Sequence, residues 1–118
     1  MPWLEVHNNY SEAVSIVIMK GDEDGCGEYG NWATHGWFNL NSGDTGTVLY
    51  SEYDAAYIYA EAPDGTWWGD QNGPEIYVNP YDKFDSCIGI GTSTWDIVQP
   101  ARVYLGKFLF GTATANLN

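Results

Sequence analysis

The sequence predicts an all-β fold, a single antiparallel β-sandwich or flattened barrel made of residues 1–118. Gly, Tyr and Trp are over-represented while Lys, Leu and Ala are not, and this composition favours strands and turns over helices. Short runs in which apolar and polar residues alternate recur along the chain, as expected of half-buried strands. Turn-forming residues separate these runs and no linker divides them, so we expect one domain.

The first two expected strands are residues 3–8 and 13–19. The first alternates well enough for a strand and ends in two asparagines, which favour a turn. The second is apolar at alternate positions on both faces, so we expect a central strand that is covered on both sides. Residues 21–30 follow with four glycines and four carboxylates, and they predict a loop that contains neither helix nor strand.

A third strand is expected over residues 31–40. Alternation gives it two faces, one of which carries Trp32, Thr34, Gly36, Phe38 and Leu40. Gly36 inside this run indicates a bulge or a close approach of the backbone to another part of the chain. A turn at 41–44 then leads into a strand over 46–53, and a meander is the simplest topology for these elements.

The later strands are expected to be shorter. A strand over 75–79 follows a turn at 71–74, and 84–91 is a glycine-spaced run. Residues 102–110 are almost continuously apolar and rich in β-branched and aromatic side chains, which predicts a buried closing strand. The last segment, 112–118, is expected to be an edge strand or a flexible tail.

The most informative stretch is 57–70, which predicts a β-hairpin. Pro63 presets φ for a type I turn, Asp64 suits the next position, and Gly65 can adopt the positive φ that closes the loop with a bulge. Cross-strand partners count outward evenly from such a loop. The predicted pairs are Ala62 with Thr66, Glu61 with Trp67, Ala60 with Trp68 and Tyr59 with Gly69.

Alternation divides this hairpin into two faces. The face expected to be core carries Ile58, Ala60, Ala62, Thr66 and Trp68. The opposite face combines aromatic rings, which stack on sugar C–H groups, with carboxylates, which bind sugar hydroxyls. The predicted ligand-binding residues are Tyr57, Tyr59, Glu61, Trp67 and Asp70. The alternative is that a second sheet covers this face and makes it core.

The charge of the chain narrows the choice of partner. Four basic residues stand against sixteen acidic ones, a formal net charge of −12, so we expect no nucleic-acid binding and no membrane insertion. A glycan or a protein is the expected partner, with a homo-oligomer as one form of the latter. No basic segment followed by an apolar run precedes Trp3, so we expect no signal peptide, and a location that is cytoplasmic or reached by a non-classical export route.

Asp22, Asp24 and Glu28 supply hard oxygen ligands on a glycine-rich loop, and their spacing begins like that of a calcium-binding loop. The pattern then departs from that motif, with Cys26 at the fifth position and Ala33 where a bidentate Glu would stand. A calcium ion held by a shorter loop and a solvated acidic turn are both compatible with these residues.

The chain has two cysteines, Cys26 and Cys87, which either form a disulfide or remain free thiols. A disulfide between them would close a long loop and, in the chain-entropy model, would stabilise the fold by about 4 kcal/mol.

No motif indicates catalysis. His7 and His35 are the only imidazoles, and the sequence has no nucleophile elbow, no paired-histidine zinc motif and no phosphate-binding loop. We therefore expect a non-enzymatic, lectin-like module that binds carbohydrate. The alternatives are a self-assembling structural or surface protein and an acidic protein that binds a basic partner.

Several short motifs also resemble those of a bacterial family, domain of unknown function number one thousand and thirty-six. They are Trp32, Gly36-Trp37-Phe38, Leu40 with Gly43, Tyr57-Ile58-Tyr59-Ala60-Glu61, and Gly65 with Trp67 and Gly69. The chain departs from the family pattern at His7 and Thr45, where such proteins often have cysteine. The resemblance implies a small β domain, without any activity attached to it.

Overall fold

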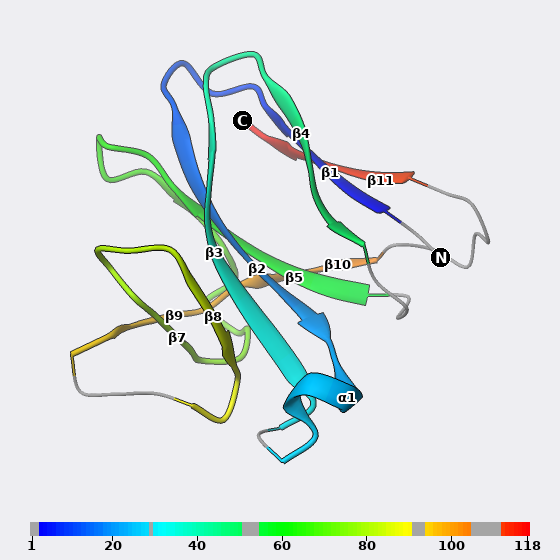
Figure 1. Ribbon diagram of the computed structural model, residues 1–118. Coiled ribbons are helices and arrows are strands. Elements are labelled where there is room, and N and C mark those ends of the chain that lie inside the picture. The colour runs from blue at the N-terminus through cyan, green and yellow to red at the C-terminus, as the bar shows by residue number, and fades with distance from the viewer. Residues whose placement is uncertain (1–2, 29, 51–54, 91–93, 105–111) are drawn as a thin grey trace.

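The computed structural model describes residues 3–28, 30–50, 55–90, 94–104 and 112–118, and their regular structure is almost entirely β (Figure 1). The strands of the first half are β1 (Trp3–Asn8), β2 (Val14–Gly21), β3 (Trp32–Leu40), β4 (Thr45–Tyr50) and β5 (Ala55–Glu61). Those of the second half are β6 (Trp67–Trp68), β7 (Ile76–Val78), β8 (Phe84–Cys87), β9 (Asp96–Val98), β10 (Ala101–Tyr104) and β11 (Thr112–Leu117). The parts of predicted strands at 51–53, 91 and 105–110 lie outside the described residues.

The strands form three sheets that pack together, which confirms the predicted sandwich-like all-β fold. One sheet has the order β11-β1-β4, a larger one has β10-β5-β2-β3-β8 with β6 also paired to β5, and β7 pairs with β9. All pairs are antiparallel except β1 with β11. The meander is wrong, because β4 leaves β3 to pair with β1 and β5 returns beside β2. The final segment is the predicted edge strand, β11.

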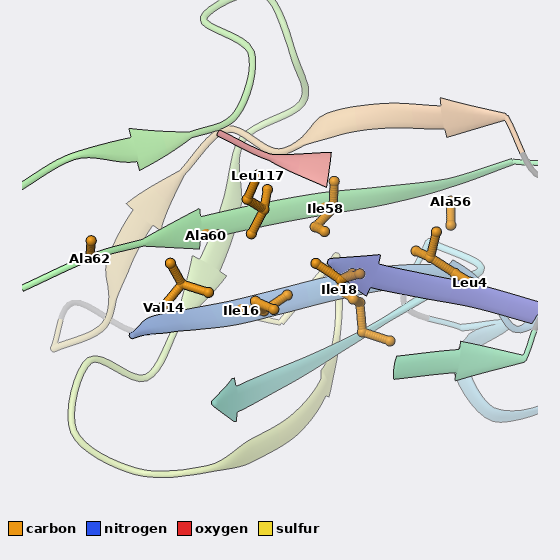
Figure 2. Packing of buried hydrophobic residues seen from close by; sticks show 10 residues of the cluster. Leu4, Val14, Ile16, Ile18, Ala56, Ile58, Ala60, Ala62 and Leu117 are labelled. Atoms are coloured by element: carbon orange, nitrogen blue, oxygen red, sulfur yellow. The ribbon is translucent and has the colours of Figure 1, made fainter. Parts of the chain in front are cut away.

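The first hydrophobic core lies between the three-stranded sheet and one face of the large sheet (Figure 2). Its buried side chains are Leu4, Val6, Val14, Ile16, Ile18, Ala56, Ile58, Ala60, Ala62 and Leu117. Burying one Leu or Ile side chain contributes about 2 kcal/mol, so this layer supplies much of the driving force for folding.

A second core lies on the opposite face of the large sheet, where the β7–β9 ribbon packs against it. Its buried side chains are Val17, Met19, Tyr59, Ile76, Val78 and Phe84. Strand β2 therefore runs between β5 and β3 with apolar side chains buried on both faces, as its sequence predicts.

The predicted irregularity at Gly36 is a β-bulge. Ile16 of β2 pairs with Phe38 and the next residue, Val17, pairs with Gly36, so that Trp37 is the extra residue. Because an extra residue reverses the alternation, side chains beyond the bulge point to the opposite face from those before it.

This reversal corrects the predicted face of β3. Trp32 packs against the second core, whereas Leu40 packs against the first, so residues 32–40 do not share one face. The predicted close approach at Gly36 is also present, because a Cβ there would overlap the ring of Phe84.

The acidic loop contains one helical turn, α1 (Glu23–Cys26), which the sequence did not predict. Asp22 is its N-cap and accepts a hydrogen bond from Gly25 N at 2.8 Å, a role in which aspartate is favoured. Cys26 and Cys87 form a disulfide that ties this turn to β8, with a Cα–Cα distance of 5.7 Å. Among the described residues no helix is long and apolar enough to cross a membrane.

Candidate functional site

The hairpin of β5 and β6 forms with the predicted turn. Gly65 has φ of 90°, the carbonyl of Thr66 accepts from Ala62 N at 2.8 Å, and Asp64 Oδ1 accepts from Thr66 N at 2.9 Å. The ladder pairs Glu61 with Trp67, as predicted. The predicted pair of Ala60 with Trp68 follows and is the last one of the ladder. The predicted pair of Tyr59 with Gly69 is absent from it.

The predicted core face of the hairpin is also correct. Ile58, Ala60 and Ala62 are buried in the first core, and Trp68 packs against them. The position of Trp67 follows from this arrangement, because adjacent residues of a strand point to opposite faces.

Tyr10, from the loop after β1, holds the tip of the hairpin in place. Its hydroxyl donates a hydrogen bond to the carboxylate of Asp64 and lies 3.0 Å from Thr66 Oγ1, while its ring meets Trp68 edge-on at 5.1 Å. The hydrogen bond from Tyr10, together with that from Thr66 N, lowers the pKa of Asp64 to about 2. The same bond raises the pKa of Tyr10.

The opposite face of the hairpin is only partly open, so the alternative that a second sheet covers this face is correct for part of it. Tyr59 is 8% exposed, because the β7–β9 ribbon covers it. Its hydroxyl donates to Glu61 Oε2 at 3.0 Å. Burial raises the pKa of Tyr59, and the hydrogen bond to Glu61 and the charges of Glu61 and Asp96 raise it further.

Trp67 stacks on Tyr59, with ring centroids 6.3 Å apart and planes 28° from parallel, and remains 46% exposed. The two rings line an open pocket of about 380 Å³ between the hairpin and β9. The remaining lining residues are Glu75, Ile97, Val98 and Gln99. The pocket thus combines one buried ring, one half-exposed ring and polar side chains.

These four residues were missed by the sequence reasoning. They come from segments before β7 and along β9, which reach the hairpin only through tertiary contacts, so no local pattern places them there. Ile97 is 53% exposed on its strand, an exposure that only the structure reveals. The side-chain amide nitrogen of Gln99 donates to the carbonyls of Gln71 and Gly73, at 2.9 and 3.1 Å.

Three predicted site residues, Tyr57, Glu61 and Asp70, lie outside the lining of this pocket, although Glu61 is hydrogen-bonded to Tyr59. Tyr57 is half-buried and meets Trp32 edge-on, with ring centroids 5.5 Å apart. The side chain of Asp70 accepts a hydrogen bond from Asn72 N at 2.9 Å, within its own turn. Of the predicted set, the structure therefore brings together Tyr59, Glu61 and Trp67.

Of the predicted calcium ligands, the structure describes the side chains of Asp22 and Glu28. Asp22 uses Oδ1 to cap α1, Glu28 is exposed, and the side chain of Asp24 lies outside the described part of the structure. No group of three or more His, Cys, Asp or Glu side chains that could hold a metal occurs among the described residues. Calcium binding stays a prediction.

A smaller hollow of about 240 Å³ contains His35, Asp85 and Lys83. Nδ1 of His35 lies 2.5 Å from Oδ1 of Asp85, and its Nε2 is buried without a hydrogen-bond partner in the described structure. This hydrogen bond therefore joins His35 on β3 to Asp85 on the neighbouring strand, β8.

The two positions at which the resembling family often has cysteine lie opposite each other. His7 on β1 pairs with Thr45 on β4, and Nδ1 of His7 is 2.5 Å from Oγ1 of Thr45. No protein-family model matches the sequence, and no curated protein or solved structure matches it. The family resemblance stays a prediction, and the function has to be inferred from the pocket itself.

Proposed function

We propose that this protein is a lectin-like module that binds carbohydrate, without catalysis, in the pocket formed by Tyr59, Trp67 and β9. The observation that supports this most directly is Trp67, which is half-exposed at the pocket although it is stacked on a buried tyrosine. A ring held rigidly with one side open to solvent is the surface on which sugar C–H groups pack.

The polar groups of the pocket suit the other side of a sugar. Glu75 and Gln99 line it, and Glu61 is fixed next to it by the hydroxyl of Tyr59. Carboxylate and amide oxygens accept hydrogen bonds from hydroxyls, so a sugar ring can stack on Trp67 while its edge is held by these acceptors. The volume of about 380 Å³ falls in the range of small-ligand pockets.

A glycan array, read with and without Ca²⁺, is the first test. We expect binding to at least one class of glycan, with an affinity that falls roughly tenfold in Trp67→Ala, because the stacking surface is lost. Tyr81→Ala is the matched control, since Tyr81 is 89% exposed on a turn and does not line the pocket. No binding in either buffer, or equal loss in the two variants, would rule out this function.

The second candidate is association with protein, either a second copy of this chain or a basic partner. Trp67 and Ile97 are exposed apolar side chains at the same pocket, which favours a protein contact. A net charge of −12 opposes self-association by repulsion, so we rank a second copy below the glycan, whereas the same charge attracts a basic partner. Light scattering at high protein concentration tests it, and a strict monomer in high salt would exclude self-assembly.

A further inference from the structure

The pocket offers hydrogen-bond acceptors, and two of its donor groups are already in use. The hydroxyl of Tyr59 donates to Glu61, and the amide nitrogen of Gln99 donates to two backbone carbonyls. Glu75 can only accept when it is ionised. A ligand group that meets the carboxylate of Glu75 must therefore supply the donor itself.

The pocket is also negatively charged. Glu75 lines it, Glu61 is bonded to its buried tyrosine, and the charge of Asp96 contributes to the raised pKa of Tyr59. Among the described residues, no Lys, Arg or His lines the pocket. The whole chain has a formal charge of −12, so the long-range potential that a ligand meets is also negative.

We infer that the carbohydrate held in this pocket carries a protonated amine, as a 2-amino sugar does. This inference rests on the proposed function and names its ligand class. An ammonium group brings three donors to a site of acceptors, and it is attracted both by carboxylates and by the face of an indole such as Trp67. A sugar carboxylate would be repelled, and an N-acetyl group would replace the charge with a neutral amide.

The test compares two trimers that differ only in acetylation, a glucosamine trimer and an N-acetylglucosamine trimer. Their binding is measured by calorimetry at a pH where the free amine is protonated. We expect the glucosamine trimer to bind roughly tenfold more tightly, and Glu75→Gln to abolish most of this difference. Trp67→Ala should weaken both trimers, because it removes the shared stacking surface.

The matched control is Glu5→Gln, which makes the same charge change on β1, in the sheet on the other side of the molecule from β7 and β9. If Glu5→Gln weakens the glucosamine trimer as much as Glu75→Gln does, attraction by net charge alone explains the binding and the inference is wrong. Equal binding of both trimers, lost in Trp67→Ala, would overturn the inference and leave the proposed function standing. Failure of both trimers and of the glycan array would overturn both.

Discussion

Asp64 is the residue whose ionisation most affects the hairpin that carries Trp67. Its carboxylate accepts hydrogen bonds from the hydroxyl of Tyr10 and the backbone N–H of Thr66, which lower its pKa from 3.8 to about 2. Because the folded pKa is below the unfolded one, this stabilisation is complete above pH 3.8 and is lost as the pH falls towards about 2. Glu12 offsets part of this loss of stability at low pH, because burial and the charge of Asp64 raise its pKa in the folded state.

We therefore expect the free energy of unfolding to fall more steeply in the wild type than in Asp64→Asn between pH 3.8 and about 2. Urea denaturation at a series of pH values measures both slopes. Asp82→Asn removes an exposed carboxylate from a turn outside the hairpin and should leave the wild-type slope unchanged. Parallel curves for the wild type and Asp64→Asn would show that the Tyr10 contact does not hold the hairpin.

At the scale of elements, the bulge in β3 decides which side chains face which core. Gly36 permits it, because the ring of Phe84 occupies the space that a side chain would need and a methyl group of Val17 is 3.1 Å from the same position. The bulge directs Trp37 towards the second core, where its indole nitrogen donates to the carbonyl of Asn79 at 2.7 Å. That bond links β3 to the turn after β7, the strand that covers Tyr59.

Gly36→Ala should destabilise the protein by about 1–3 kcal/mol, because the added methyl overpacks the contact with Phe84. The measurement is urea unfolding of Gly36→Ala, alone and combined with Phe84→Leu. In the double-mutant cycle, the two substitutions together should destabilise the protein less than the sum of their separate effects, since a smaller side chain at position 84 makes room for the added methyl. Additive effects would mean that Phe84 is not the obstacle.

The elements themselves were largely predictable from local patterns. Alternation located β1, β2 and β3, and the Pro63-Asp64-Gly65 turn fixed the register of β5 with β6. Three features were not predictable locally. The α1 turn depends on tertiary contacts of the loop that include the disulfide. The reversal of faces in β3 depends on whether Gly36 marks a bulge or only a close approach. The departure of β4 depends on which sheet offers a free edge.

At the scale of the whole molecule, the large sheet is enclosed by a core on each face. The disulfide joins α1 to the edge strand β8 across a sequence separation of 61 residues. It closes a loop that includes β3, β4, β5, β6 and β7, and therefore half of the residues that line the pocket.

Reducing this disulfide, or replacing it in Cys26→Ser/Cys87→Ser, should lower the free energy of unfolding by about 4 kcal/mol through the greater freedom of the unfolded chain. Denaturation with and without reductant measures the loss, and the double variant should not respond to reductant. A wild type whose midpoint is unaffected by full reduction, verified by thiol titration, would contradict this expectation.

The candidate site was predictable only in part. The stacking of Tyr59 on Trp67 follows from the hairpin register, and Glu61 follows from its position beside Trp67. The sequence offered coverage by a second sheet only as an alternative. It did not identify the β7–β9 ribbon as the cover of Tyr59, because packing of one sheet on another leaves no mark in either segment alone. The chemistry of Tyr57 and Asp70 suits a sugar site, but the structure places Tyr57 against Trp32 and Asp70 within its own turn.

The most direct test of the central claim, that sugar stacks on Trp67, follows the indole N–H signals in an NMR titration with the glucosamine trimer. The chain has six tryptophans, and Trp67→Ala identifies the signal of Trp67 by its disappearance. We expect that signal to shift most, while the indole of Trp3, on the opposite sheet, stays in place. A saturating titration in which the Trp67 signal does not move would contradict the account.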